Sequence, residues 1–208
     1  MRAFEQSSHS ERPAGTRPVR MRRVIERDGS VSRELFVLCS EQGLLSLPRC
    51  TRCHEFLGWS LDRSLGEACV TCTGDGGAPW STADPFALPI REILEDTVCV
   101  RADVPADALE SAYVDLDLHA TPVLEVDDSV LGIITKSDIM RRGRCSTSKA
   151  RDVMTTPAVT VPPTARVTDA VALMARHDIG RLPVVHPVLG VVGMVTAASL
   201  LQTLDHRR

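Results

Sequence analysis

Aromatic side chains, lysine and long apolar runs are all scarce in this chain of 208 residues. Aromatic residues make up 3% of the chain, which disfavours a stacking platform for single-stranded nucleic acid. Lysine occurs only as Lys136 and Lys149, and the net charge is −3, so nucleic acid is an unlikely partner. Apolar runs such as 191–201 are shorter than the roughly 18–20 residues that cross a membrane, and we expect no membrane partner.

Targeting and catalytic motifs are missing as well. The N-terminus shows no apolar segment of the kind that marks a secretory signal, which favours a cytoplasmic location. The sequence contains no G-x-S-x-G, H-E-x-x-H, Walker-type or G-x-G-x-x-G motif. We therefore expect a protein that is not an enzyme.

The C-terminal half of the chain contains a duplication. The run TPVL at 121–124 matches LPVV at 182–185, and GIIT at 132–135 matches GMVT at 193–196. Both motifs return after 61 residues, which indicates one supersecondary unit used twice. The apolar pattern of each copy predicts a small α/β (α+β) unit in the order β-α-β-β-α, including a strand at 158–161. Two such units are expected to pack as a pseudo-symmetric domain, because about 50 residues make a small core.

Several motifs resemble those of the cystathionine-β-synthase (CBS) domain, and the tandem resembles a CBS pair, or Bateman module. They are VMTTP at 153–157, RLPVV at 181–185 and GIITKSD at 132–138. The resemblance covers residues 93–205. It implies an adenosine derivative bound in the cleft between the copies, and assembly into a homodimer.

The resemblance also implies which residues bind an adenine nucleotide such as AMP, ADP or ATP. Asp138 would bind the ribose hydroxyls and Thr135 the phosphate, which is chemically sensible because a carboxylate accepts two hydrogen bonds from a vicinal diol. The other implied contacts are Thr155, Pro157 and Ala158 near the base, Arg181 as a cation for phosphate, and Thr196 in the second copy.

The second copy departs from this motif at one position. Ser199 stands where the first copy has Asp138, and a serine offers no pair of carboxylate oxygens. We therefore expect one good nucleotide site. Asp138 is also an ordinary residue for capping a helix, so a ligand-free dimerisation scaffold remains an alternative.

Four cysteines in two C-x-x-C pairs form the second informative feature. Cys50 and Cys53 are separated by fifteen residues from Cys69 and Cys72. This spacing is typical of a four-thiolate zinc site, and the segment resembles a zinc ribbon on the cysteines alone.

Other interpretations of the cysteines stay open. Cys39 follows an apolar run and is an alternative fourth ligand to Cys69, and His54 is a further candidate. The same thiolates suit iron or an iron–sulfur cluster. A disulfide framework requires an oxidising compartment, which nothing in the sequence indicates.

Composition divides the chain into six expected segments. They are a disordered arginine-rich tail at 1–22, a cysteine-rich, zinc-ribbon-like module at 23–73, a linker at 74–92, CBS repeat 1 at 93–143, a connector at 144–152 and CBS repeat 2 at 153–205.

The favoured function is a stand-alone regulatory module. It senses an adenine nucleotide through the CBS pair and signals through its zinc-binding module or through an unknown partner protein. One alternative is a transcription-linked regulator whose zinc module contacts nucleic acid, which would appear as salt-dependent binding. Another is the ligand-free scaffold, which nucleotides would not stabilise against heat.

Overall fold

The computed structural model describes residues 15–39, 42–62, 67–73, 84–142 and 148–205. The chain divides into two compact units. The smaller contains residues 37–81 together with the chain up to residue 19, and the larger contains residues 20–36 and 82–208. Strands β1 (Thr16–Ile25) and β2 (Val31–Cys39) contribute residues to both units.

The smaller unit is built on short antiparallel strands. Its other elements are β3 (Gly43–Ser46), α1 (Leu47–Cys50), β4 (Phe56–Asp62) and β5 (Glu67–Cys72). Strand β5 pairs antiparallel with β4 and with the first residues of β1. Val37, Cys50 and Val70 are buried together at its centre.

The first repeat in the larger unit has the predicted order of elements. They are β6 (Thr97–Arg101), α2 (Ala106–Asp115), β7 (Ala120–Leu124), β8 (Val130–Thr135) and α3 (Lys136–Arg142). Strand β7 lies parallel to β6 and antiparallel to β8. The buried Tyr113 hydroxyl of α2 donates a 2.6 Å hydrogen bond to the Ile134 carbonyl of β8, which fixes the helix to the sheet.

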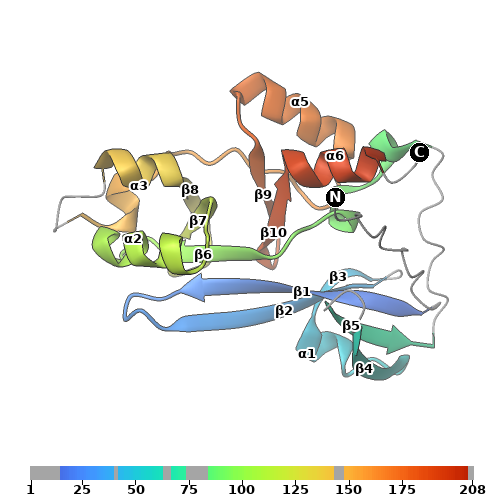
Figure 1. Cartoon of the computed structure of the whole chain (residues 1–208). Coiled ribbons are helices and arrows are strands. Elements are labelled where there is room, and N and C mark those ends of the chain that lie inside the picture. The colour runs from blue at the N-terminus through green and yellow to red at the C-terminus, as the bar shows by residue number, and fades with distance from the viewer. Residues whose placement is uncertain (1–14, 40–41, 63–66, 74–83, 143–147, 206–208) are drawn as a thin grey trace, which may run out of the picture. The chain divides into compact units, whose positions relative to one another are not determined.

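The second repeat keeps the last four elements of this order. They are α5 (Val167–His177), β9 (Arg181–His186), β10 (Gly190–Thr196) and α6 (Ala197–Asp205). Helices α5 and α6 pack together beside the β9–β10 pair (Figure 1). The strand predicted at 158–161 is wrong, since only a single bridge joins Val161 to Val184. Pro162 and Pro163 follow directly and have no N–H with which to extend a ladder.

The segment that precedes each repeat packs against the other repeat. Before the first repeat, the 3-10 turns η1 (Pro85–Ala87) and η2 (Ile90–Glu92) lie next to α5, and the Val167 N–H donates to the Leu88 carbonyl at 2.9 Å. Before the second repeat, α4 (Ala150–Val153) packs on the first, where the Ala150 N–H donates to the Val104 carbonyl at 2.8 Å. We call these two stretches the crossing segments, 85–95 and 148–155.

Two glycines at equivalent positions allow the crossing segments to approach the sheets. A Cβ on Gly132 would lie 2.5 Å from the Thr155 carbonyl oxygen, and one on Gly193 would lie 2.7 Å from that of Glu95. Any larger side chain at either position would therefore collide with backbone. This close approach explains why both copies carry glycine there.

Several expected boundaries change. Residues 16–22, expected in a disordered tail, belong to β1, because partners far along the chain pair with that strand, such as Thr97 with Arg22. The crossing segment 85–95 is formed by the end of the expected linker, 85–92, and by the first residues expected in CBS repeat 1. The remaining parts of the expected tail and linker, at 1–14 and 74–83, and residues 143–147 at the start of the expected connector, lie outside the described residues.

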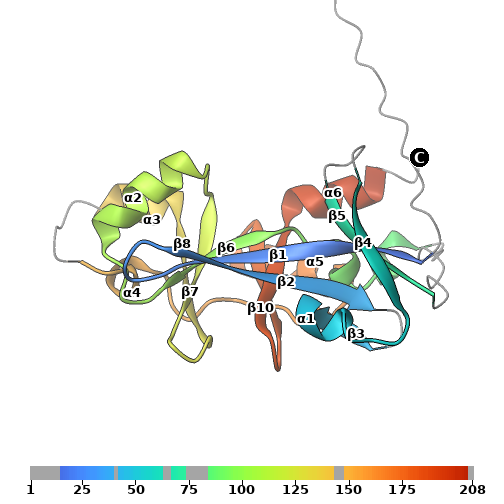
Figure 2. The ribbon, with the colours of Figure 1, turned by 90° about the horizontal axis from the view of Figure 1, so that it is seen from below.

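The turn of the β1–β2 hairpin lies alongside the first repeat (Figure 2). Arg101 of β6 reaches Glu26 in this turn, with 3.1 Å between its Nε and the carboxylate. Among the described residues, no helix is long and apolar enough to cross a membrane.

Candidate nucleotide site and cysteine cluster

Thr135 and Asp138 meet where β8 runs into α3. The Thr135 backbone N–H and hydroxyl both donate to Oδ2 of Asp138, at 2.9 and 2.6 Å. The Asp138 N–H in turn faces the Thr135 hydroxyl at 3.4 Å. The structure therefore brings the two predicted ligand residues together, and it gives Asp138 the local capping role that the sequence also allowed.

The Asp138 carboxylate is buried but remains charged. Burial acts to raise its pKa, whereas hydrogen bonds from Thr135 and Arg141 act the other way and lower the pKa below the usual 3.8. Arg141 donates to Oδ1 at 3.1 Å from a side chain that is 71% exposed. Among the described residues, the partner of Oδ1 is thus a long, exposed side chain that an incoming ligand can displace.

The remaining predicted residues fall into two groups. Thr155 pairs with Ile133 of β8 through hydrogen bonds in both directions, 2.9 and 3.0 Å, so it lies near Thr135. Pro157 is exposed and Ala158 is half-buried just beyond it. Arg181 and Thr196 belong to the second copy, where they face each other across β9 and β10.

The second copy repeats the same local geometry with a serine in place of the aspartate. The Thr196 N–H donates to Oγ of Ser199 at 2.9 Å, and the Ser199 N–H donates to the Thr196 hydroxyl at 3.0 Å. Ser199 is therefore a helix cap that lacks the carboxylate of its counterpart.

A residue that the sequence reasoning missed, Glu95, brings a carboxylate to the second copy. Its backbone pairs with Met194 in both directions, as Thr155 pairs with Ile133 in the first copy. The Thr196 hydroxyl donates to the Glu95 carboxylate at 2.7 Å. The duplication was the sequence signal that pointed to Glu95, because the segments that precede the first strand of each copy lie in equivalent places.

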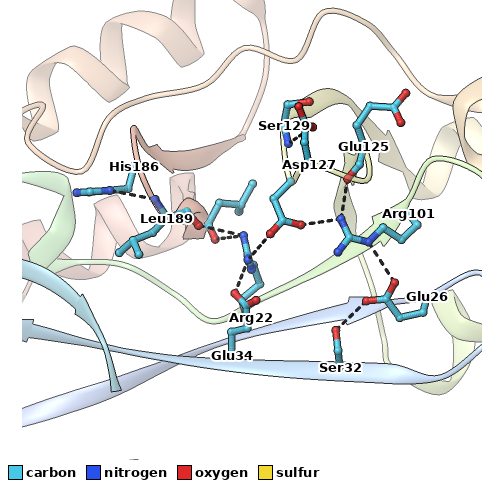
Figure 3. Close-up of polar contacts among 12 residues, drawn as sticks. Arg22, Glu26, Ser32, Glu34, Arg101, Glu125, Asp127, Ser129, His186 and Leu189 are labelled. Carbon is cyan, nitrogen blue, oxygen red and sulfur yellow. Dashed lines mark hydrogen bonds and ion pairs between the residues drawn. The ribbon is translucent and has the colours of Figure 1, made fainter. Parts of the chain in front are cut away.

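A buried arginine outside the predicted site joins both repeats to the β1–β2 hairpin (Figure 3). Arg22 of β1 is only 2% exposed. Its guanidinium donates to the Leu189 and Val191 carbonyls of the second repeat at 3.2 and 3.0 Å. It also pairs with Glu34 of β2, and with Asp128 of the first repeat at 3.3 Å.

Asp128 is shared between two arginines. Arg101 donates to its other carboxylate oxygen at 2.6 Å and also binds Glu26. Burial opposes the charge on Arg101, but its hydrogen bonds with Asp128 and Glu26 outweigh this effect and raise the pKa. Arg22, Glu26, Glu34, Arg101 and Asp128, which we call the Arg22 network, thus connect three chain segments.

The predicted metal ligands all lie in the smaller unit. Cys50 and Cys69 are buried, whereas Cys53 and Cys72 are half-buried. Across the residues that the structure describes, no three His, Cys, Asp or Glu side chains are arranged to hold a metal ion. The zinc-ribbon expectation is therefore not supported by the side-chain geometry.

Comparison with protein families matches the CBS domain model twice, at residues 90–144 and 150–206. Together these matches cover more than half of the chain, and the protein belongs to the CBS-domain family. The two matched ranges correspond to the two repeats and confirm the predicted CBS pair.

Individual relatives match over little more than half of this chain. An inosine-5'-monophosphate dehydrogenase of Halobacterium salinarum is 32% identical over 113 residues, which is 54% of this chain and 23% of that enzyme. Among solved structures, a similar one is the CBS domain pair of protein MJ0100, which was solved in complex with 5'-methylthioadenosine and S-adenosyl-L-methionine. It has a TM-score of 0.52 and is 19% identical, and the match covers 59% of this chain and 99% of that chain. The CBS domain of a bacterial CNNM/CorC family Mg2+ transporter, in complex with ATP, has a TM-score of 0.53 at 16% identity, over 58% and 89%.

Proposed function

We propose that this protein is a regulatory module that senses an adenine nucleotide at the Thr135–Asp138 site of its CBS pair. The observation that carries the proposal is the Asp138 carboxylate, which is ionised, buried, and covered on Oδ1 by the exposed Arg141 side chain. Adenosine derivatives bound to the two solved CBS structures support the same class of ligand. The role is regulatory and not catalytic.

In this proposal, the ligand acts by shifting the populations of two arrangements of the pair. Thr155, next to the site, lies on the crossing segment that ties the second repeat to the first. A ligand that contacts both Asp138 and this segment therefore favours one arrangement of the two repeats over others. The output then passes through the cysteine-rich unit or to a separate partner protein.

Calorimetric titration with AMP, ADP and ATP tests the proposal. We expect one nucleotide to bind per chain, and binding to raise the melting temperature in proportion to the logarithm of ligand concentration. A single site is expected because Ser199 offers no carboxylate to the ribose, and because the Glu95 carboxylate beside the Thr196 hydroxyl repels a phosphate. If none of the three nucleotides binds, the ligand-free scaffold is the better interpretation.

The matched variant Glu95→Gln tests the reason for the single site. It removes the charge and keeps the size of the side chain, so a second, weaker nucleotide site should appear while the first keeps its affinity. Two equal sites in the unaltered protein would show that Glu95 does not exclude phosphate.

Assembly into a homodimer is part of the proposed function. Apolar side chains remain exposed on helices of both repeats, among them Val114 at 75%, Met140 at 81% and Leu201 at 65%. Exposed apolar surface of this kind is typical of interaction sites. We expect light scattering to give the mass of a dimer at micromolar concentration, and Met140→Glu to shift it towards monomer. A monomer at that concentration in the unaltered protein would contradict this part.

We also propose that the cysteine-rich unit holds a structural zinc ion. The two C-x-x-C pairs motivate this part, and zinc contributes folding energy directly in such small modules.

A further inference from the structure

The two cysteines of the second C-x-x-C pair lie on opposite faces of β5. Alternate residues of a strand share a face, so Cys72 points to the same side as Val70, and Cys69 points to the other. The irregularity in the β4–β5 pairing falls between Phe56 and Gly58 of β4, so the alternation within β5 is unbroken. Cys69 is completely buried on its own side. A tetrahedral site that includes both Cys69 and Cys72 is therefore not compatible with this strand.

Cys39 lies on the side of β2 that faces the buried cluster of Val37, Cys50 and Val70. It follows Val37 by two residues in β2, so these side chains share a side of that strand. Val37, Val70 and Cys50 form one buried cluster, against which Cys72 packs. Cys39 and Cys72 each lie two residues beyond one of the clustered valines, and both therefore reach the region of Cys50.

The thiols of Cys39, Cys50, Cys53 and Cys72 also affect one another electrostatically. Burial raises the pKa of Cys50 to about 11, with further contributions from Cys72, Cys39 and Cys53. Burial also raises the pKa of Cys72, with Cys39 and Cys53 adding to it, while Arg17 lowers it. A bound cation would reverse the effect, because a coordinating thiol loses its proton.

A hydrogen-bonded turn presents the other two thiols. The Cys53 N–H donates to the Cys50 carbonyl at 3.0 Å, and the Phe56 N–H donates to the Cys53 carbonyl at 3.2 Å. We propose that Cys39, Cys50, Cys53 and Cys72 form a four-thiolate zinc site, with Cys39 in the place that the spacing of the cysteines assigned to Cys69.

The chemistry of the four groups fits zinc, which prefers an all-thiolate, tetrahedral shell in structural sites. Four thiolates around a divalent ion leave a net negative charge, and Arg17 next to Cys72 offsets part of it. The described thiols are not arranged as a closed shell. We therefore expect metal binding to draw them together, to release protons and to order the unit.

The inference rests on the zinc part of the proposed function and is tested with the full chain purified under reducing conditions. Elemental analysis should find one zinc ion per chain in the unaltered protein and in Cys69→Ser, and little or none in Cys39→Ser. Reconstitution with Co²⁺ should give the strong near-ultraviolet charge-transfer absorption of four thiolates in both metal-binding proteins. In Cys39→His the metal should remain and the absorption should fall by about a quarter, in proportion to the thiolates left.

The controls separate loss of a ligand from loss of the fold. Retained metal in Cys39→His together with loss in Cys39→Ser would identify a ligand, since a structural defect would affect both. Loss of metal in Cys69→Ser with retention in Cys39→Ser would overturn the ligand set and leave a zinc site standing. Absence of zinc, and of Co²⁺ binding, in the unaltered protein would overturn both.

Discussion

Replacement of Arg22 by methionine is expected to lower the free energy of unfolding of the larger unit by roughly 3 kcal/mol, at the low end of the range for breaking a buried ion pair. Methionine fills much of the same space but removes the Arg22 donor from Glu34 and from two carbonyls of the second repeat, while Asp128 keeps its bond from Arg101. The value lies at the low end because Glu34 and Asp128 are 47% and 35% exposed and water can reach them. Thermal melting should show a decrease of roughly 6–12 °C for a chain of this size.

The matched control is Arg27→Met in the same hairpin. Arg27 also forms an ion pair, with Asp103 at 3.5 Å, but its side chain is 77% exposed. Exposed pairs contribute less than about 1 kcal/mol, so this variant should melt close to the unaltered protein. Equal melting temperatures for the two variants would show that the Arg22 network does not stabilise the fold.

Loss of the Asp138 carboxylate is expected to weaken nucleotide binding by about ten- to hundred-fold. This corresponds to roughly 1.5–3 kcal/mol, the range for hydrogen bonds to a charged group. Calorimetry on Asp138→Ala gives the affinity directly. Asp138→Asn should fall within the same range, because it retains a cap for Thr135 but loses the charge. Equal affinity in the unaltered protein and in Asp138→Asn would exclude the carboxylate from the site.

Ser199→Ala provides the control for the capping role. It removes the equivalent cap in the second copy, so it reports the cost to stability without touching the proposed site. Its nucleotide affinity should match that of the unaltered protein. Since the pKa of Asp138 is lowered, the stability that its ionised form contributes is present at neutral pH and is lost as the pH falls below the usual carboxyl value of 3.8.

The duplication was sufficient to predict the CBS pair but not how its repeats connect. Periodicity identifies helices and strands within a segment, and it predicted β6 to α3 in the right order. It does not reveal which repeat a short segment such as α4 packs against, because that depends on contacts far apart in sequence. The strand expected at 158–161 failed for a local reason that was visible, namely the two prolines that follow.

In the candidate site, too, local contacts were predicted and contacts between residues far apart in the sequence were not. The motif spacing placed Thr135 beside Asp138, because three residues at a strand–helix junction bring the side chains together. Glu95 and Arg22 were not predicted, since each acts on residues about a hundred positions or more away. For the cysteines, spacing alone favoured Cys69, whereas the alternation of β5 places Cys69 on the face opposite to Cys72.

The crossing segments also set the order in which the chain can fold during synthesis. The first repeat is complete only when α4 has emerged from the ribosome, because α4 covers part of its core. The segment 85–95 emerges early but finds its partners, Ala165, Val167 and Met194, only when the second repeat has been made. Neither repeat is thus a complete folding unit by itself. A fragment cut at the boundaries of one repeat would lack the crossing segment that precedes the other repeat and packs on this one.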